Sequence, residues 1–247
     1  MIRAIRDTLL ATKKVCGMEI VLGGAMPLQM HLTLLEIRKK ELHCLETNGV
    51  LLEEEQLNNP AMKGVPVCLA VTGKGILHKR LPSIENPDKR EIVSQILPDA
   101  RAEDFYFQFS EGDGYTYVSI IRKELLDNIL EVFRKCNKYV LNISLGPFAL
   151  EGVHELLGVE EIYTGVQTIS FSGEKIAAIS SSASIEKNIP YKIDKEEIAP
   201  HLLLSYSTAF NCLLNIAYPC LQDHPLVSES NSEHTNRKIF TIAGWSV

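Results

Sequence analysis

The segment from Asp104 to Asn137 restricts the possible fold more than any other part of the sequence. It begins with DFYFQFS, EGDG and YTYVSII, so aromatic residues alternate along two apolar runs on either side of a glycine-containing turn. Such alternation around a short turn predicts an antiparallel hairpin. The next residues, RKELLDNILEVFRKCN, place apolar side chains at helical spacing. A hairpin that leads directly into an amphipathic helix predicts an α/β protein that contains antiparallel strands.

The rest of the first half follows the same pattern of short strands and helices. The run HLTLLEIRKKELHCLE at 31–46 predicts a hairpin with its turn at Arg38 to Lys40. A basic helix is expected over residues 1–17, either packed on the domain or in contact with a membrane surface or a partner. Further expected elements are a strand ending at Gly23 and Gly24, a turn at Asn48 and Gly49, a solvated acidic segment at 51–59, strands at 65–71 and 76–81 joined as a hairpin, a helix ending before Pro98, a strand at 138–146, and a helix that Pro147 opens and Gly158 closes.

The second half repeats the order of a hairpin followed by a helix. EIYTGVQTISFSGEKIAAISSS predicts two strands that turn at Ser172 to Glu174, and a long helix is expected from Pro200. The polar tail at 222–237 is rich in turn-forming residues, which predicts a loop or linker. We therefore expect an α/β fold with mixed sheets and two related halves. The predicted divisions are a first half at 1–150 with an inserted subdomain at about 65–145, a second half at 151–221, and a linker or juxtamembrane tail at 222–247.

Composition limits the class of protein. Apolar residues make up 45% and charged residues 23% of the chain, which is ordinary for a globular protein and excludes a disordered one. The net charge of −6 argues against a general nucleic-acid binder, because such proteins carry a basic excess. The six cysteines form no C-x-x-C pair and lie mostly in apolar runs. Buried reduced thiols, and therefore a cytoplasmic location, are favoured over disulfides.

The C-terminal residues NRKIFTIAGWSV place Arg237 and Lys238 directly before an apolar run that contains a tryptophan. A basic flank followed by apolar residues is typical of the cytoplasmic start of a membrane helix. One hypothesis is therefore that a membrane span follows Val247, and the alternative is an ordinary final strand. The gene sequence downstream of Val247 distinguishes the two.

No stretch of the sequence carries a recognisable catalytic motif. TGKG at 72–75 resembles the end of a phosphate-binding loop, but the earlier glycine and the final Ser or Thr of that motif are missing. EGDG at 111–114 lacks the spaced acidic ligands of a calcium loop. Both segments are therefore predicted to be turns. The histidines form no H-E-x-x-H pair, and His154 is predicted to be a surface or capping residue rather than a zinc ligand. We therefore predict no catalytic residue, no cofactor and no metal, and we do not expect an enzyme.

The order of elements from Val65 to Leu150 resembles the cytoplasmic domain of the L protein of type II secretion systems (GspL) and its relative PilM of type IV pilus systems. The resemblance covers roughly residues 60–215 and implies an actin-like fold of two ribonuclease-H-like halves. It also implies a place at the cytoplasmic face of an inner membrane, where such proteins join a secretion or pilus-assembly ATPase to membrane partners. The similar segments are VPVCLAV, ILHKRLP, KREIVSQIL, FYFQFSEGDGYTYVSII, RKELLDNILEVFRKC, YVLNISLGPFAL and, later, HLLLSYSTAFNCLL.

The resemblance raises the question of nucleotide binding. Nucleotide-binding relatives have Asp-x-Gly at the opening hairpin, where the carboxylate organises magnesium and the glycine lets backbone amides approach phosphate. This chain has Glu36, Ile37 and Arg38 there, and the matching place in the second half has Ser170 without an Asp and keeps only Gly173. We therefore predict that the protein does not bind ATP productively.

The leading hypothesis is a non-catalytic scaffold that docks a secretion-type ATPase and links it to inner-membrane assembly proteins, with a possible homodimer and no nucleic-acid partner. Candidate docking residues are the acidic run Glu53 to Glu55 and the basic turn at 38–40, which are also typical of solvated loops. The first alternative is an actin-like nucleotide-binding protein, in which Glu36 replaces the missing Asp and Lys39 or Lys40 contacts phosphate. The second is a soluble adaptor of another pathway.

Overall fold

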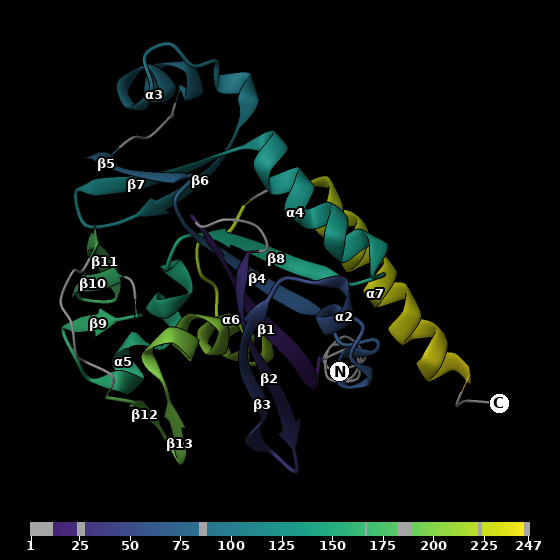
Figure 1. The fold of residues 1–247 in the computed structure, drawn as a ribbon. Helices are drawn as coiled ribbons and strands as arrows, with labels where there is room; N and C mark the ends of the chain where they lie inside the picture. The colour runs from purple at the N-terminus through teal and green to yellow at the C-terminus, as the bar shows by residue number, and fades with distance from the viewer. Residues whose placement is uncertain are drawn as a thin grey trace, which may run out of the picture.

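A five-stranded mixed sheet forms the centre of the computed structural model (Figure 1), which describes residues 12–23, 28–83, 88–165, 167–181, 189–221 and 224–244. The strand order is β3-β2-β1-β4-β8. The β1–β2 and β2–β3 pairs are antiparallel, whereas the β1–β4 and β4–β8 pairs are parallel. This arrangement is that of a ribonuclease-H-like sheet, as the resemblance implied. The strands are β1 (Lys14–Leu22), β2 (Gln29–Arg38), β3 (Glu41–Leu51), β4 (Val67–Gly73) and β8 (Val140–Leu145).

Burial on both faces explains the composition of the central strands. Almost every side chain of β1 and β4 is buried, because each strand has a neighbour on both sides and both faces of the sheet are covered. Cys16, Met18 and Ile20 of β1 belong to one hydrophobic core, whereas Val15 belongs to the other. The sheet therefore separates two cores, and a polar side chain in these strands needs a hydrogen-bond partner.

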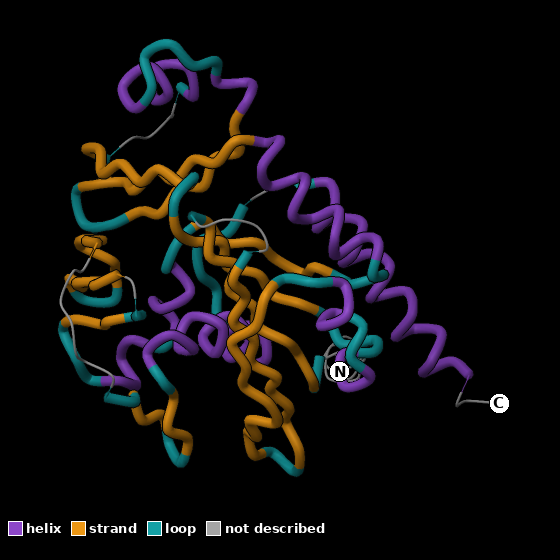
Figure 2. Tube along the Cα trace, in the orientation of Figure 1, coloured by secondary structure: helices purple, strands orange, loops and turns teal. Residues whose placement is uncertain are grey.

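Helices cover the two faces of this sheet (Figure 2). Helix α4 (Lys123–Lys135) packs on one face through its apolar stripe, and α7 (Pro225–Gly244) joins the same core. Helix α6 (Leu203–Leu214) packs on the opposite face and is buried throughout residues 203–211. Its small buried side chains, which include Ser205 and Ala209, allow the helix to pack closely on the sheet.

A second sheet carries the segment between β4 and β8. It consists of β5 (Ile76–Pro82), β7 (Tyr115–Arg122) and β6 (Phe105–Glu111) in that order. Helix α3 (Lys89–Ile96) contributes Ile92 and Val93 to a small core of its own with this sheet. The predicted hairpin of alternating aromatic residues is confirmed, since β6 pairs with β7 in antiparallel register.

The predicted hairpin between residues 65–71 and 76–81 is wrong. Both strands exist, but β4 pairs with β1 and β8, whereas β5 pairs with β7 in the other sheet. Gly73 and Gly75 have φ angles of 88° and 117°, and this left-handed backbone turns the chain out of one sheet into the other. Local sequence therefore identified the turn but not the strands that pair on either side of it.

The second half contains two smaller sheets. Strands β9 (Glu161–Tyr163), β10 (Gln167–Ser172) and β11 (Lys175–Ser181) are antiparallel in the order β11-β10-β9, and β12 (Tyr191–Ile193) pairs with β13 (Glu196–Ile198). The order β11-β10-β9 repeats that of β3-β2-β1, and the turn predicted at Ser172 to Glu174 is confirmed. The boundaries proposed for the halves and the inserted subdomain stay a prediction. The short helical segments are α2 (Glu54–Leu57), η1 (Pro60–Met62), η2 (Ala102–Asp104), η3 (Phe148–Gly152), α5 (His154–Leu157) and η4 (Pro200–Leu202).

The tail predicted as a loop or linker at 222–237 is helical, because α7 spans Pro225–Gly244. Leu226 and Val227 pack against the core under the five-stranded sheet, and the Asn231 side chain donates a hydrogen bond to the Leu141 carbonyl at 3.0 Å. Tertiary packing thus outweighs the turn-forming composition of this segment. The ordinary final strand considered for the C-terminal residues is also wrong, because the chain is helical up to Gly244. The interpretation of this segment as a juxtamembrane tail stays a prediction.

Two predictions near the N-terminus also differ from the structure. The helix expected over residues 1–17 is wrong at residues 14–17, which belong to β1. Residues 1–11 of that expected helix lie outside the described residues. Gly24, one of the two glycines expected to end the first strand, also lies outside them. The turn expected at Asn48 and Gly49 is instead part of β3, because these residues pair with Leu32 and His31 of β2. Pairing along the whole length of β2 extends the strand through this turn-like sequence.

Candidate functional site

A buried glutamate lies near the carboxyl ends of the parallel strands β1 and β4. Glu19 of β1 is 2% exposed, and both of its carboxylate oxygens have partners. Thr72 Oγ1 donates to Oε1 at 2.6 Å, and His31 Nδ1 lies 3.1 Å from Oε2. Sheet register explains this meeting, because Glu19 is directly opposite His31 in β2 and opposite Ala70 in β4, two residues before Thr72. The three side chains therefore share one face of the sheet.

A second histidine reaches this place from a distant part of the chain. His201 lies in η4, immediately before α6, and its ring meets the His31 ring edge to face with centroids 5.3 Å apart. Burial and the neighbouring His31 lower the pKa of His201, against an opposite effect of Glu19. We call Glu19, His31, Thr72 and His201 the polar cluster.

The polar cluster lies where open α/β sheets bind ligands, at the carboxyl ends of parallel strands. Its carboxylate is nevertheless engaged by protein groups on both oxygens. The described ranges contain no group of three or more His, Cys, Asp or Glu side chains placed to hold a metal ion. The aliphatic part of Lys74 lies against Gly23, which follows β1. The observed arrangement is a closed hydrogen-bond network rather than an open cation site.

The hairpin at 31–46 is not the first hairpin of the sheet. Strands β1 and β2 are the first antiparallel pair of the sheet, so the first connection of the sheet follows Gly23. The turn at Lys39 and Lys40 joins β2 to β3 at the opposite end, where the Ile37 amide donates to the Lys13 carbonyl before β1 begins. The prediction that this turn occupies the first phosphate-loop position is therefore wrong, because the preceding strand pairs with β2.

The residues proposed for an alternative phosphate site are likewise at the wrong end of the sheet. Glu36 forms a surface ion pair with Arg38, whose Nη2 lies 2.6 Å from Oε2. Lys39 and Lys40 form the turn with φ angles of 50° and 70°. In the second half, Ser170 Oγ donates to Glu161 Oε1 at 3.0 Å beside the turn at 172–175. These contacts do not assemble a phosphate-binding geometry around Glu36.

Other features singled out in the sequence have structural roles. His154 begins α5, stacks on Phe171 at 3.8 Å between ring centroids and bonds through Nε2 to the Val159 carbonyl at 2.7 Å. It is not the cap of α5, because Val153 and Gly158 occupy the cap positions. TGKG and EGDG are turns at the ends of β4 and β6. The acidic run at 53–55 caps and begins α2, where Glu54 and Glu55 occupy the first turn.

The sequence contains one signal for the polar cluster, which is Glu19 itself. A charged residue inside the apolar strand GMEIVL has to find partners when it is buried. The identity of those partners depends on the β1–β2 register and on the placement of η4, neither of which is encoded locally. Sequence reasoning therefore missed all four residues of the polar cluster, and only Glu19 had a local signal that could have found it.

A second group of polar contacts joins the β5-β7-β6 sheet to the β10–β11 hairpin. Tyr115 donates its hydroxyl to the Ile176 carbonyl at 2.7 Å, and Tyr117 donates to the Ala177 carbonyl at 2.9 Å. Burial raises the pKa of both tyrosines, so their hydroxyls remain protonated donors at neutral pH. We call these two hydrogen bonds the tyrosine latch, because they connect sheets from different parts of the chain.

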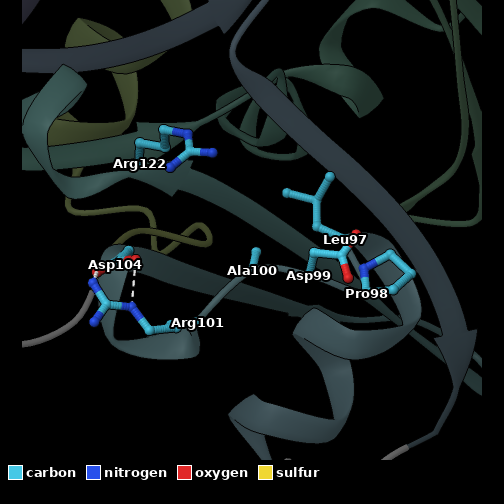
Figure 3. A pocket seen from close by; sticks show the side chains of 7 residues that line it. All are labelled: Leu97, Pro98, Asp99, Ala100, Arg101, Asp104 and Arg122. Atoms are coloured by element: carbon cyan, nitrogen blue, oxygen red, sulfur yellow. Dashed lines mark hydrogen bonds and ion pairs between the residues drawn. The ribbon is translucent and has the colours of Figure 1, made fainter.

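Several surface hollows are large enough to receive part of a ligand, and two of them are described here. One, of about 390 Å³, lies between α3 and the start of α4 (Figure 3). Within it Arg101 pairs with Asp104 at 3.0 Å, while Arg122 stands apart with its guanidinium 5.3 Å from the Phe105 ring centroid. The other, of about 510 Å³, lies between the β2–β3 turn, the β12–β13 turn and α6.

No protein-family model matches the sequence, and no curated protein is significantly similar to it. Several solved structures align with part of this chain at low sequence identity, and three of them are described below. The cytoplasmic domain of EpsL, an inner membrane component of the type II secretion system of Vibrio cholerae, is 13% identical with a TM-score of 0.42 over 67% of this chain and 71% of that chain.

The other two similarities are of the same order. A chain of the PilM–PilN type IV pilus biogenesis complex is 14% identical with a TM-score of 0.49. The match covers 67% of this chain and 60% of that chain. A Bacteroides thetaiotaomicron protein with an actin-like ATPase fold and unknown function gives 10% identity and a TM-score of 0.40 over 68% of this chain and 70% of that chain. Within its described residues, the structure has no helix both long and apolar enough to span a membrane.

Proposed function

We propose that the protein is a non-catalytic cytoplasmic scaffold of a type II secretion or type IV pilus-like platform at an inner membrane. In this role it docks a secretion ATPase and links that ATPase to membrane-embedded partners. The proposal is supported by the segments from Val65 to Leu150 that resemble GspL and PilM, and by the ribonuclease-H-like order of the central sheet. The TM-scores are all below 0.5 and add no weight to it.

The observation that favours a scaffold over an ATPase is the state of Glu19. An actin-like ATPase needs a carboxylate free to organise magnesium near the first turn of its sheet. Here the acidic side chain of β1 is buried, and Thr72 and His31 occupy its two oxygens. Opening this site for a hydrated cation would break both contacts, and the described residues offer no further acidic ligand beside it.

Titration calorimetry of the purified chain with magnesium and ATP tests the proposal that the protein does not bind nucleotide. We expect no saturable heat, and a micromolar dissociation constant would overturn it. The docking part is tested by light scattering of the chain mixed with the secretion-type ATPase encoded in the same genome, with an unrelated P-loop ATPase as the control. A complex with the first ATPase alone is expected, and its absence would contradict docking.

A nucleotide-binding protein of the PilM type is the second candidate, and the position of Glu19 at the carboxyl end of β1 favours it. It makes a separate claim about residues. If calorimetry detects ATP, Glu19→Ala should abolish the binding, whereas Glu36→Ala should leave it unchanged, because Glu36 lies at the opposite end of the sheet. Loss of binding in Glu36→Ala would instead restore the turn at Lys39 and Lys40 as the phosphate site.

A further inference from the structure

Helices α4 and α7 pack on the same core beside the five-stranded sheet and leave a seam between them at the surface (Figure 1). Two hollows, of about 320 Å³ and about 230 Å³, lie in this seam. Their linings share Arg134 of α4 with Leu226 and Glu229 of α7, so the hollows adjoin each other. We call them together the α4–α7 seam. Two adjoining hollows suit an elongated ligand.

Carboxylates outnumber cations in the lining of the α4–α7 seam. The acidic side chains are Asp127 and Glu131 of α4 and Glu229 and Glu233 of α7, and the cations are Arg134 and Lys138. Four carboxylates against two cations give a formal charge of −2 while His224 is neutral. Lys123, whose ammonium lies 5.5 Å from the Tyr106 ring centroid, is outside both linings. The charge of the lining therefore selects a cationic ligand.

The protein already engages both cations of the seam. Lys138 is 8% exposed, and its ammonium donates to the Met62 carbonyl at 3.0 Å. Arg134 lies 3.6 Å from the Glu131 carboxylate. Glu229 and Glu233 are exposed, and neither has an ion-pair partner in the part of the chain that the structure describes. They are four residues apart on α7, where like charges repel each other, and a bound cation would remove this repulsion.

A buried donor without an acceptor lies in the same lining. His224, directly before α7, is 6% exposed, and its Nε2 has no hydrogen-bond partner among the described residues. Nδ1 accepts from the Leu226 amide at 3.2 Å, so the neutral ring carries its proton on Nε2. Asp127 Oδ1 is 3.7 Å from Nε2, beyond hydrogen-bonding distance, and accepts from the Tyr106 hydroxyl at 2.9 Å. A ligand that supplies an acceptor beside Asp127 would explain the unpaired donor.

The ligand therefore has to combine positive charge with a hydrogen-bond acceptor. A metal ion does not fit, because Nε2 carries the ring proton and the described residues contain no metal-holding group. A polyamine has positive charge but no carbonyl. A peptide has backbone carbonyls and can carry arginine, whose planar guanidinium pairs with carboxylates and stacks on aromatic rings. The rings of Tyr106 and His224, with centroids 4.9 Å apart, line the first hollow.

We propose that the α4–α7 seam binds an arginine-containing basic segment of a partner protein. Guanidinium groups pair with Asp127, Glu229 and Glu233, and a backbone carbonyl of the segment accepts from His224 Nε2. This inference deepens the docking function proposed above and rests on it for the occupant, a partner protein. It adds the location and the chemistry of one docking surface.

Fluorescence anisotropy of the full chain tests the seam with a labelled peptide of sequence Ser-Arg-Ala-Arg-Ala-Arg-Ser. Alternate residues of an extended peptide are about 6.6 Å apart, which is close to the rise of about 6 Å between carboxylates four residues apart on a helix. Matched control peptides replace all arginines by glutamine or by glutamate. We expect saturable binding of the arginine peptide alone.

Matched variants separate the seam from general attraction to a chain of net charge −6. Glu229→Gln combined with Glu233→Gln should weaken binding at least about fivefold, because two ion pairs are lost. Glu160→Gln combined with Glu174→Gln makes the same change in net charge at exposed positions outside the seam, and should weaken binding less than about twofold. His224→Asn keeps an acceptor for the Leu226 amide but removes the Nε2 donor, and should weaken binding about threefold.

Several outcomes would overturn the proposal. One is equal affinity for the three peptides, and another is equal weakening by the two glutamine pairs. A dimer that light scattering detects, and that Glu229→Gln with Glu233→Gln dissociates, would assign the seam to a second copy instead of a partner protein. Because both glutamine pairs lie at exposed positions, their melting temperatures should match that of the parent protein, which excludes unfolding as the cause of weaker binding. No secretion ATPase enters these assays, so their failure is distinct from failure of the scaffold function.

Discussion

Gly17 in β1 lies directly against the backbone of Ser205 in helix α6. A Cβ atom on Gly17 would collide with the Ser205 carbonyl oxygen and would lie 2.8 Å from the Ala209 amide nitrogen. The contact brings α6 onto the sheet as closely as two backbones allow. Because η4 leads directly into α6, the same contact positions His201 against His31 within the polar cluster.

Replacing Gly17 with alanine should therefore destabilise the protein by about 1–3 kcal/mol, because the helix backbone has to move away from β1. Urea unfolding monitored by circular dichroism measures the change. Gly49→Ala is the matched control within the same sheet, since its Cβ would meet only the His31 ring at an ordinary 3.4 Å. If the two variants were equally stable, the close approach of α6 at Gly17 would be wrong.

Thr72→Val tests the hydrogen-bond network around Glu19. Valine keeps the shape of threonine but removes the hydroxyl that donates to Glu19 Oε1 at 2.6 Å, and we expect a loss of about 1.5–3 kcal/mol in unfolding free energy. A double-mutant cycle with Glu19→Gln isolates the interaction. Additive effects of the two substitutions would show that the Thr72 hydroxyl does not contribute through Glu19.

The tyrosine latch should control the opening of the β10–β11 hairpin. Tyr115→Phe combined with Tyr117→Phe removes both donors to β11, at about 0.5–1.5 kcal/mol for each hydrogen bond. Hydrogen exchange should become faster in peptides from β10 and β11. Tyr163→Phe is the control, because that hydroxyl donates only to the nearby Gly165 carbonyl. The latch would be refuted by equal exchange rates in the latch variant and the control.

Acidification should weaken the start of helix α7 through His224. The Leu226 amide donates to His224 Nδ1 at 3.2 Å, and this acceptor is lost when the ring is protonated. Burial lowers the pKa of His224 below its usual 6.5, although Asp127 acts in the opposite direction. The unfolded chain therefore binds this proton more readily, so stability is lost as pH falls below about 6.5 toward the lower folded pKa.

Urea unfolding at about pH 7.5 and about pH 5 measures this effect. His224→Asn should reduce the loss, because asparagine caps a helix without titrating in this range. Comparison between variants is needed, since burial also lowers the pKa of His78, to about 4, and that of His201. The same pH dependence in His224→Asn and the parent protein would remove His224 from the explanation.

Local sequence predicted the elements whose pattern is complete within a short segment. The β6–β7 hairpin and α4 follow from alternating aromatic residues and a helical apolar stripe, and both form as expected. Pairing between distant segments was not predictable in this way. Val67–Gly73 and Ile76–Pro82 are adjacent strands in sequence but belong to different sheets, and α7 forms because the sheet offers its apolar residues a surface.

The polar cluster shows the same limit for the site. Glu19 stands out in its apolar strand, yet His31 and Thr72 are partners only because of the register of β2 and β4. His201 follows 182 positions after Glu19 and is brought back by the packing of α6. The prediction that the hairpin at 31–46 is the first hairpin of the sheet is wrong for the same reason. Only the pairing of β1 with β2 shows that another connection precedes it.

Helix α7 is 20 residues long, which corresponds to about 30 Å, and its early residues Leu226, Val227 and Asn231 hold it against the sheet and β8. Its C-terminal part projects away from the sheet (Figure 1). A rigid rod fixed near one end acts as a lever. The part beyond Asn231 is about 20 Å long, so a rotation of about 10° at Asn231 moves Gly244 by about 3 Å. Small changes in the sheet would therefore appear as large displacements at Gly244.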